Sequence, residues 1–196
     1  MAIMIALLSL ALILQLFILI NPLSSFSVLV AAYKRKMNVR KIAYTSVLVA
    51  FALAVIMALI GPYLFSIFGV TIDSFRIAGG LVLLLLGIDT IRDKKEKKEV
   101  GKIDSVISII ATPLLTGPAT ISFIAIKSYE INQIALLGNI VFAFLLVGIV
   151  FVLFSYTLDK INTKIISVTS KILGLFLTAM AIQMIVTGLT NMIQAV

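Results

Sequence analysis

Two clusters of proline and small polar residues interrupt stretches that are otherwise apolar. The first is Asn21-Pro22-Leu23-Ser24-Ser25, and the second covers residues 111–120 with the sequence ATPLLTGPAT. Proline has no amide hydrogen and clashes with the carbonyl four residues back, so each proline frees backbone groups within a helix. Free backbone groups cost several kcal/mol in hydrocarbon. We therefore expect both clusters to face the protein interior or a hydrated cavity.

Both clusters contain dipeptides that are typical of a helix start. In Asn21-Pro22, Asn is a favourable cap and Pro suits the first helical position, and Thr112-Pro113 and Gly117-Pro118 can begin helices in the same way. A helix N-terminus offers free N–H donors and partial positive charge, which suit a carboxylate. Hydroxyls and freed carbonyls suit an ammonium group or a cation. We expect the N-termini of the two half-helices to approach each other at mid-membrane from opposite sides.

A small zwitterion fits such a site without any ionised side chain. The residues that we expect to bind this substrate are Asn21, Pro22, Ser24, Ser25, Thr112, Pro113, Thr116, Gly117, Pro118 and Thr120. The alternative is a plain proline kink in each helix, with a structural role only.

Three further polar residues are candidates for ion coupling. Asp89 is the carboxylate that could carry a proton, and Asn139 and Gln183 lie within apolar runs. Each has a structural alternative: an interfacial position for Asp89 and interhelical hydrogen bonds for Asn139 and Gln183. The glycines Gly79, Gly80 and Gly174 are expected to allow close helix packing.

The elements that must position these residues are six apolar runs. The chain has 196 residues, of which 62% are hydrophobic and 12% charged. The runs cover residues 3–32, 42–70, 77–91, 103–126, 134–158 and 172–192. A spanning helix needs about 20 apolar residues, so the sequence predicts an all-α, polytopic membrane protein with six transmembrane helices. The runs are continuous rather than alternating, which excludes a transmembrane β-barrel.

The composition also limits the chemistry. It excludes a soluble globular enzyme, a disordered chain and a disulfide-stapled domain. The chain contains no Cys and no His, which removes thiol nucleophiles, His-based triads and His/Cys metal sites. An intramembrane aspartyl protease needs two membrane carboxylates, and only Asp89 is a candidate. We therefore expect no enzyme, no metal site and no cofactor, apart from Na⁺ or H⁺ as a coupling ion.

The charges indicate how the chain lies in the membrane. Fourteen of the 16 basic residues fall in the loops after runs one, three and five, and only Arg76 and Lys127 fall on the other side. By the positive-inside rule the odd-numbered loops are cytoplasmic, so both termini face out across the cell membrane. The net charge of +8 is then explained by orientation and anionic lipid headgroups, not by nucleic acid.

The two halves of the chain resemble each other weakly. Asn21-Pro22-Leu23 corresponds to Thr112-Pro113-Leu114, and residues 76–79 (RIAG) correspond to 171–174 (KILG). These matches predict one transmembrane domain with a first repeat at about 12–92, a linker at about 93–103 and a second repeat at about 104–196. Three spans are an odd number, so the second repeat is inverted, an arrangement typical of transporters with a site near the midplane.

Four ordered motifs resemble the MarC family. They are Asn21-Pro22-Leu23, residues 75–80 (FRIAGG) with 87–89 (GID), residues 113–118 (PLLTGP), and residues 181–185 (AIQMI). The resemblance covers nearly the whole chain. It implies six spans and transport of small neutral amino acids such as glycine and alanine, coupled to a cation gradient. A channel or exporter for another small solute, a non-transporting scaffold and a homo-oligomer stay open as alternatives.

Overall fold

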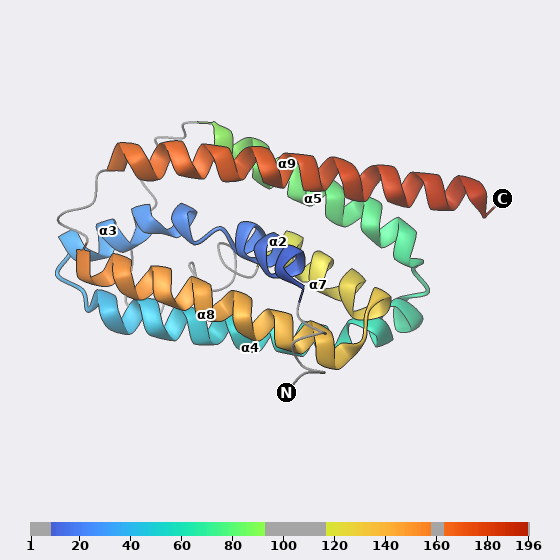
Figure 1. Ribbon diagram of the computed structural model, residues 1–196, viewed down its shortest axis with the longest axis horizontal. Helices are drawn as coiled ribbons and strands as arrows, with labels where there is room; N and C mark the ends of the chain where they lie inside the picture. The colour runs from blue at the N-terminus through green and yellow to red at the C-terminus, as the bar shows by residue number, and fades with distance from the viewer. Residues whose placement is uncertain (1–8, 93–116, 158–162, 196) are drawn as a thin grey trace.

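The all-helical fold is confirmed. The computed structural model describes residues 9–92, 117–157 and 163–195, and Figure 1 shows them as helices that run along one long axis. The helices are α2 (Leu10–Ile20), the 3₁₀ helix η1 (Pro22–Ser25), α3 (Phe26–Lys34), α4 (Val39–Phe68), α5 (Ile72–Ile91), α7 (Pro118–Glu130), α8 (Gln133–Thr157) and α9 (Thr163–Gln194).

Four of the described helices are long and apolar enough to cross a membrane. They are α4, α5, α8 and the part of α9 from Ile165 onward, with mean hydropathies of 2.5, 1.7, 2.8 and 2.1. These helices match the predicted spans two, three, five and six. The boundary predicted for span six is wrong, because α9 begins at Thr163, well before the apolar run at 172–192. The described parts of spans one and four are shorter helices, so the prediction of six spans is not confirmed and stays a prediction.

Capping residues set the ends of α4 and the start of α5. The Asn38 side chain accepts a hydrogen bond from the Lys41 N–H and so begins α4. The helix ends at Gly69, whose φ of 61° lies in the left-handed region that glycine adopts without strain. Thr71 then caps α5 through the Ser74 N–H. A tight turn therefore reverses the chain between two long helices.

The closest helix pair is α5 with α9. A Cβ added at Gly80 would lie 2.7 Å from Ile185 Cγ1, and one at Gly174 would lie 3.1 Å from the Gly87 carbonyl oxygen. As the residue number rises along α5, its partner's number falls along α9, so the two helices are antiparallel. The predicted close packing at Gly80 and Gly174 is confirmed, and Gly87 contributes equally.

The remaining contacts place α7 among the helices of the first half of the chain. The helix packs against α4 and α5, while α2 packs mainly against α8. A Cβ at Gly61 in α4 would lie 3.0 Å from Ala125 Cα, and one at Gly79 in α5 would lie 2.7 Å from Ser122 Cβ. These glycines allow α7 to lie against both helices at backbone distance, as we expected for Gly79.

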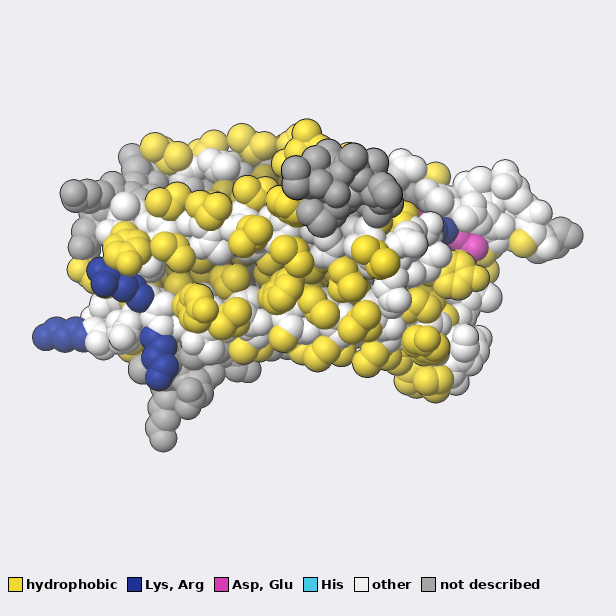
Figure 2. Space-filling model, turned by 60° about the horizontal axis from the view of Figure 1, so that its bottom comes forward, with side chains coloured by type: hydrophobic (Ala, Val, Ile, Leu, Met, Phe, Trp, Pro, Cys, Tyr) yellow, Lys and Arg dark blue, Asp and Glu magenta, His cyan; other side chains and the backbone are white. Residues whose placement is uncertain are grey.

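The face shown in Figure 2 is largely hydrophobic along its middle, with charged side chains at its two ends. Large exposed hydrophobic side chains lie along α4, α5, α8 and α9, as expected of lipid-facing helices. Exposed basic residues gather where α3 ends and α4 begins, and we call this the basic end; they are Lys34, Arg35, Lys36, Arg40 and Lys41. There the Arg40 guanidinium lies 4.3 Å from the centre of the Tyr156 ring on α8. At the other end of Figure 2, basic and acidic side chains occur together.

Candidate functional site

The first predicted break lies where the sequence places it. Helix α2 ends at Ile20, and Asn21 adopts the left-handed conformation with φ 43° and ψ 66°. Asn21 N–H donates to the Phe17 carbonyl, which closes α2, and Pro22 takes the first position of η1. Asn is one of the few residues that adopt this conformation readily. The expected capping role is wrong in detail, because the Asn21 side chain makes no capping hydrogen bond to η1.

The side chains at this break are deeply buried. Asn21 is 2% exposed and Ser25 is fully buried. The Ser25 hydroxyl has no hydrogen-bond partner among the residues that the structure describes. A buried hydroxyl without a partner costs free energy, so Ser25 is suited to bind a polar group. Ser24 lies in η1 beside it, and its side chain falls outside the described part of the chain.

Of the second predicted break, the structure describes the part from Gly117 onward, where Gly117-Pro118 begins α7. Gly117 is extended, with ψ 176°, and Pro118 is the first helical residue. Thr120 is 2% exposed, and Gly117 is buried. The first N–H groups of a helix have no intrahelical acceptor, so Ala119 and Thr120 present donors at the positive end of the helix dipole. Thr112, Pro113 and Thr116 lie outside the described residues.

The two half-helices have different neighbours. η1 packs against α8 and α9, whereas α7 packs against α4 and α5. They also run in opposite senses, with α3 leading to the basic end and α7 leading away from it (Figure 1). The structure therefore has a buried helix start in each half of the chain, directed toward opposite ends. The expected approach of the two N-termini stays a prediction.

The structure describes the contacts or exposure of the three candidates for ion coupling. Asn139 is buried, its Oδ1 accepts the Ser9 N–H at 2.9 Å, and its Nδ2 donates to the Ala135 carbonyl at 2.7 Å. Asn139 thus links the start of α2 to α8 by hydrogen bonds. Interhelical hydrogen bonding of this kind is the structural alternative given for Asn139 above. Gln183 is exposed on α9 and donates to Thr187 Oγ1. Asp89 is exposed within the last turn of α5, and its interfacial position stays a prediction.

A network of ionised side chains at the end opposite the basic end was not foreseen. Arg76 pairs with both Asp73 and Glu130, and Lys127 Nζ lies 2.7 Å from Glu130 Oε2. Asn191 Nδ2 on α9 donates to Asp73 Oδ1 at 3.0 Å. The network joins α5, α7 and α9. The sequence carried one signal for it, since Asp73 and Arg76, like Lys127 and Glu130, are spaced i, i+3 on a helix.

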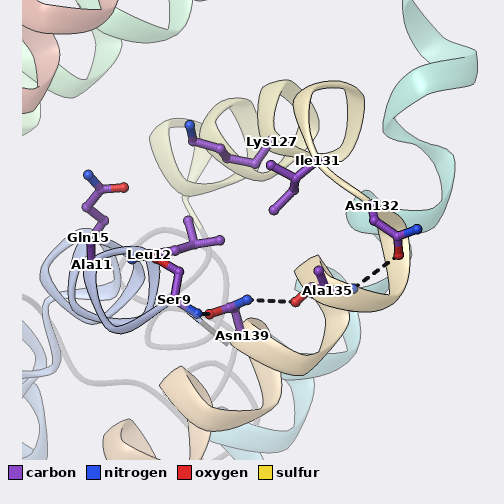
Figure 3. Close-up of a pocket in the computed structure, with 9 residues that line it drawn as sticks. All are labelled: Ser9, Ala11, Leu12, Gln15, Lys127, Ile131, Asn132, Ala135 and Asn139. Carbon is purple, nitrogen blue, oxygen red and sulfur yellow. Dashed lines mark hydrogen bonds between the residues drawn. The ribbon is translucent and has the colours of Figure 1, made fainter. Parts of the chain in front are cut away.

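Two pockets flank the contact between α2 and α7. The larger, of about 470 Å³, lies between α2, α7 and α8, with Gln15 and Lys127 on opposite walls and Asn139 at its base (Figure 3). The smaller, of about 320 Å³, also contains Gln15 and Lys127, together with Arg76 and Glu130. Polar side chains, among them Gln15 and Lys127, thus line hollow space on both sides of the contact between α2 and α7.

A bundle of apolar helices with buried breaks and a mixed surface of this kind defines a multi-pass integral membrane protein. Comparison with known families matches residues 6–193 to the description "MarC family integral membrane protein". The chain belongs to the MarC family, and the resemblance found in its motifs is confirmed.

Relatives carry names that describe a membrane protein and no activity. The chain is 33% identical to "UPF0056 membrane protein MJ1677" of Methanocaldococcus jannaschii, over 89% of this chain and 92% of the relative. It is 28% identical to "UPF0056 membrane protein YhcE" of Escherichia coli, over 89% of this chain and 88% of the relative. A third relative, from Aquifex aeolicus, is 26% identical over 92% of both chains. No solved structure matches the chain significantly.

Proposed function

We propose that this protein is a secondary transporter of small neutral amino acids, such as glycine and alanine, that works by alternating access. The observation that carries the proposal is the pair of buried helix starts, at Asn21-Pro22 and at Gly117-Pro118. Each combines backbone donors with small polar side chains, and neither residues 21–25 nor residues 117–120 include an ionised side chain. Such a site suits a zwitterion with a small neutral side chain.

The helix pairing supports an inverted repeat. The second helices of the two halves, α4 and α8, pack together, and so do the third helices, α5 and α9. The α5–α9 pair is antiparallel, as a pseudo-two-fold axis in the membrane plane requires. We propose that the halves exchange access to the two sides of the membrane, with uptake coupled to H⁺ or Na⁺ and with both termini outside the cell. The proposal includes no catalytic step.

The test is a panel of amino acids added to the purified protein. Substrates that bind the folded state raise its thermal stability by mass action. We expect glycine and alanine to raise the unfolding temperature, lysine and glutamate to leave it unchanged, and Na⁺ to enlarge the shift if Na⁺ is the coupling ion. Proteoliposomes then measure uptake of radiolabelled alanine under a Na⁺ or H⁺ gradient.

Two outcomes would overturn the proposal. If no amino acid shifts the unfolding temperature and none enters the vesicles, the substrate class is wrong. A conformational change that moves whole domains takes microseconds to milliseconds. If alanine molecules enter faster than one per such cycle, the protein is a channel. The Ser25→Ala variant is informative in both assays, because its hydroxyl is buried at the first break. We expect weaker alanine binding from this variant.

A further inference from the structure

The smaller pocket beside the ionic network has the composition of a ligand site. It holds about 320 Å³ and is bounded by helices from both halves of the chain: α2, α5, α7 and α9. Its lining includes the apolar side chains of Phe123 and Met184, and amide groups come from Gln15 and Gln183. Ligand pockets are typically apolar with a few convergent polar groups. Here the polar groups include charges of both signs.

Arg76 already forms two ion pairs at this pocket. One of its terminal nitrogens pairs with Asp73 and the other with Glu130, and the residue is only 8% exposed. The guanidinium therefore helps to fix the position of the Glu130 carboxylate. A ligand that displaced Arg76 would take the guanidinium away from two carboxylates, at a cost in free energy.

Lys127 and Glu130 are the charged groups that keep capacity for a ligand. Their side chains are each 28% exposed. An ammonium group has three donors, and the contact with Glu130 Oε2 uses one donor of Lys127. The ammonium also lies 5.6 Å from the centre of the Phe123 ring. Each Glu130 oxygen has one described partner, Arg76 or Lys127, and a carboxylate oxygen can accept a second hydrogen bond.

We propose that this pocket is a second binding site for a small zwitterionic amino acid, separate from the buried helix starts. The ligand's carboxylate pairs with Lys127, its ammonium group with Glu130 and the amide oxygens of Gln15 and Gln183, and its side chain lies against Phe123 and Met184. Paired charges of opposite sign select a zwitterion over a simple anion or cation. The choice of ligand rests on the proposed function, while the location rests on the pocket alone.

The pocket lies beside the ionic network, toward the end of the molecule opposite the basic end. Lys127 and Gln15 also line the larger neighbouring pocket, so both pockets open along the contact of α2 with α7. α2 leads to the break at Asn21 and α7 begins at the break at Gly117. A ligand held at Lys127 is therefore positioned between the two helices that carry the breaks.

The test uses the natural lack of cysteine in the chain. Thr187 lines the pocket, so Thr187→Cys places a single thiol at its wall. The purified variant in nanodiscs is labelled with a charged thiol reagent, with and without saturating alanine. We expect alanine to slow labelling at least fivefold. Ile193→Cys, on the same helix and 75% exposed, is the matched control, and alanine should leave its rate unchanged.

Charge variants then assign the contact. In the Thr187→Cys background, Lys127→Met should abolish the protection and Lys127→Arg should retain it. Protection that survives Lys127→Met would overturn the assignment of the carboxylate contact. If alanine stabilises the wild-type protein against heat but does not slow the labelling of Thr187→Cys, the second site is wrong and the proposed transport still stands. Protection without any uptake would contradict the transport proposal and support the site.

Discussion

At the scale of single residues, the backbone of Asn21 decides where the first span breaks. The left-handed conformation turns the chain out of α2, and Pro22 then begins the next helix. L-residues pay roughly 1–2 kcal/mol in this conformation, and Asn pays less because its short side chain is tolerated there. Glycine, which has no Cβ, pays nothing. The conformational preference of the Asn21 backbone therefore contributes to the break together with Pro22.

Substitutions at Asn21 test this explanation. Asn21→Gly and Asn21→Val both remove the side-chain amide, but only Val resists the left-handed conformation. We expect Asn21→Val to have a free energy of unfolding about 1–2 kcal/mol lower than Asn21→Gly. Denaturant or thermal unfolding of the purified protein measures the difference. Equal stability of the two variants would show that the backbone at this position is not strained by a side chain.

Gly87 tests the close packing of α5 on α9. A Cβ there would lie 2.5 Å from Thr178 Oγ1 and 2.9 Å from the Thr178 backbone nitrogen. We expect Gly87→Ala to lower the free energy of unfolding by about 1–3 kcal/mol, because the two backbones must separate. Gly148→Ala on α8 is the matched control, since its Cβ would meet nothing closer than Val47 Cγ1 at 3.8 Å. A loss of stability at Gly148 as large as at Gly87 would contradict the explanation.

At the scale of elements, the dipeptide Gly-Pro occurs at two places and has a different effect on the helix at each. Gly117-Pro118 begins α7, whereas Gly61-Pro62 lies inside α4, which continues unbroken from Val39 to Phe68. Pro62 cannot donate to the carbonyl of Ala58, four residues back. Gln133 Nε2, from the start of α8, donates to that carbonyl at 3.3 Å. A neighbouring helix thus satisfies the freed group, which allows proline inside a spanning helix.

A double-mutant cycle measures this compensation. Gln133→Leu should lower the free energy of unfolding by about 1 kcal/mol, because it leaves the Ala58 carbonyl without a donor. In the Pro62→Ala background the same substitution should cost less, since the new backbone N–H reaches that carbonyl. The cycle reports a coupling energy between the two positions. A coupling of zero would mean that Gln133 and Pro62 act independently.

The elements also show what the sequence could predict. Hydropathy placed α4, α5 and α8 because apolar side chains mark the hydrocarbon depth, and Asn21-Pro22 and Gly117-Pro118 marked two helix starts. Hydropathy missed the first two turns of α9, because polar residues such as Thr163 continue a helix beyond the apolar core. The contact of Arg76 with Glu130 and that of Gln133 with Ala58 span 54 and 75 residues. Such pairings depend on tertiary packing and carry no local signature.

At the scale of the whole molecule, the first span of each half packs with the other half. α7, in the second half of the chain, lies on α4 and α5, while α2, in the first half, lies mainly on α8. The ion pair between Arg76 and Glu130 and the glycine contacts at Gly61 and Gly79 hold α7 to the first half. A rocking motion would therefore move α7 together with α4 and α5.

The charge distribution predicts which end of the molecule faces the cytoplasm. The basic end carries five exposed basic residues, Lys34, Arg35, Lys36, Arg40 and Lys41, so the positive-inside rule predicts that it faces the inside of the cell. Single cysteines test this in a chain that has none of its own. Lys34→Cys lies at the basic end, and Val70→Cys lies in the turn between α4 and α5 at the opposite end. In intact cells, an impermeant thiol reagent should label Val70→Cys and should label Lys34→Cys only after permeabilisation. The cysteine-free parent controls for background, and the reverse labelling pattern would show that the bundle is inserted with its basic end outward.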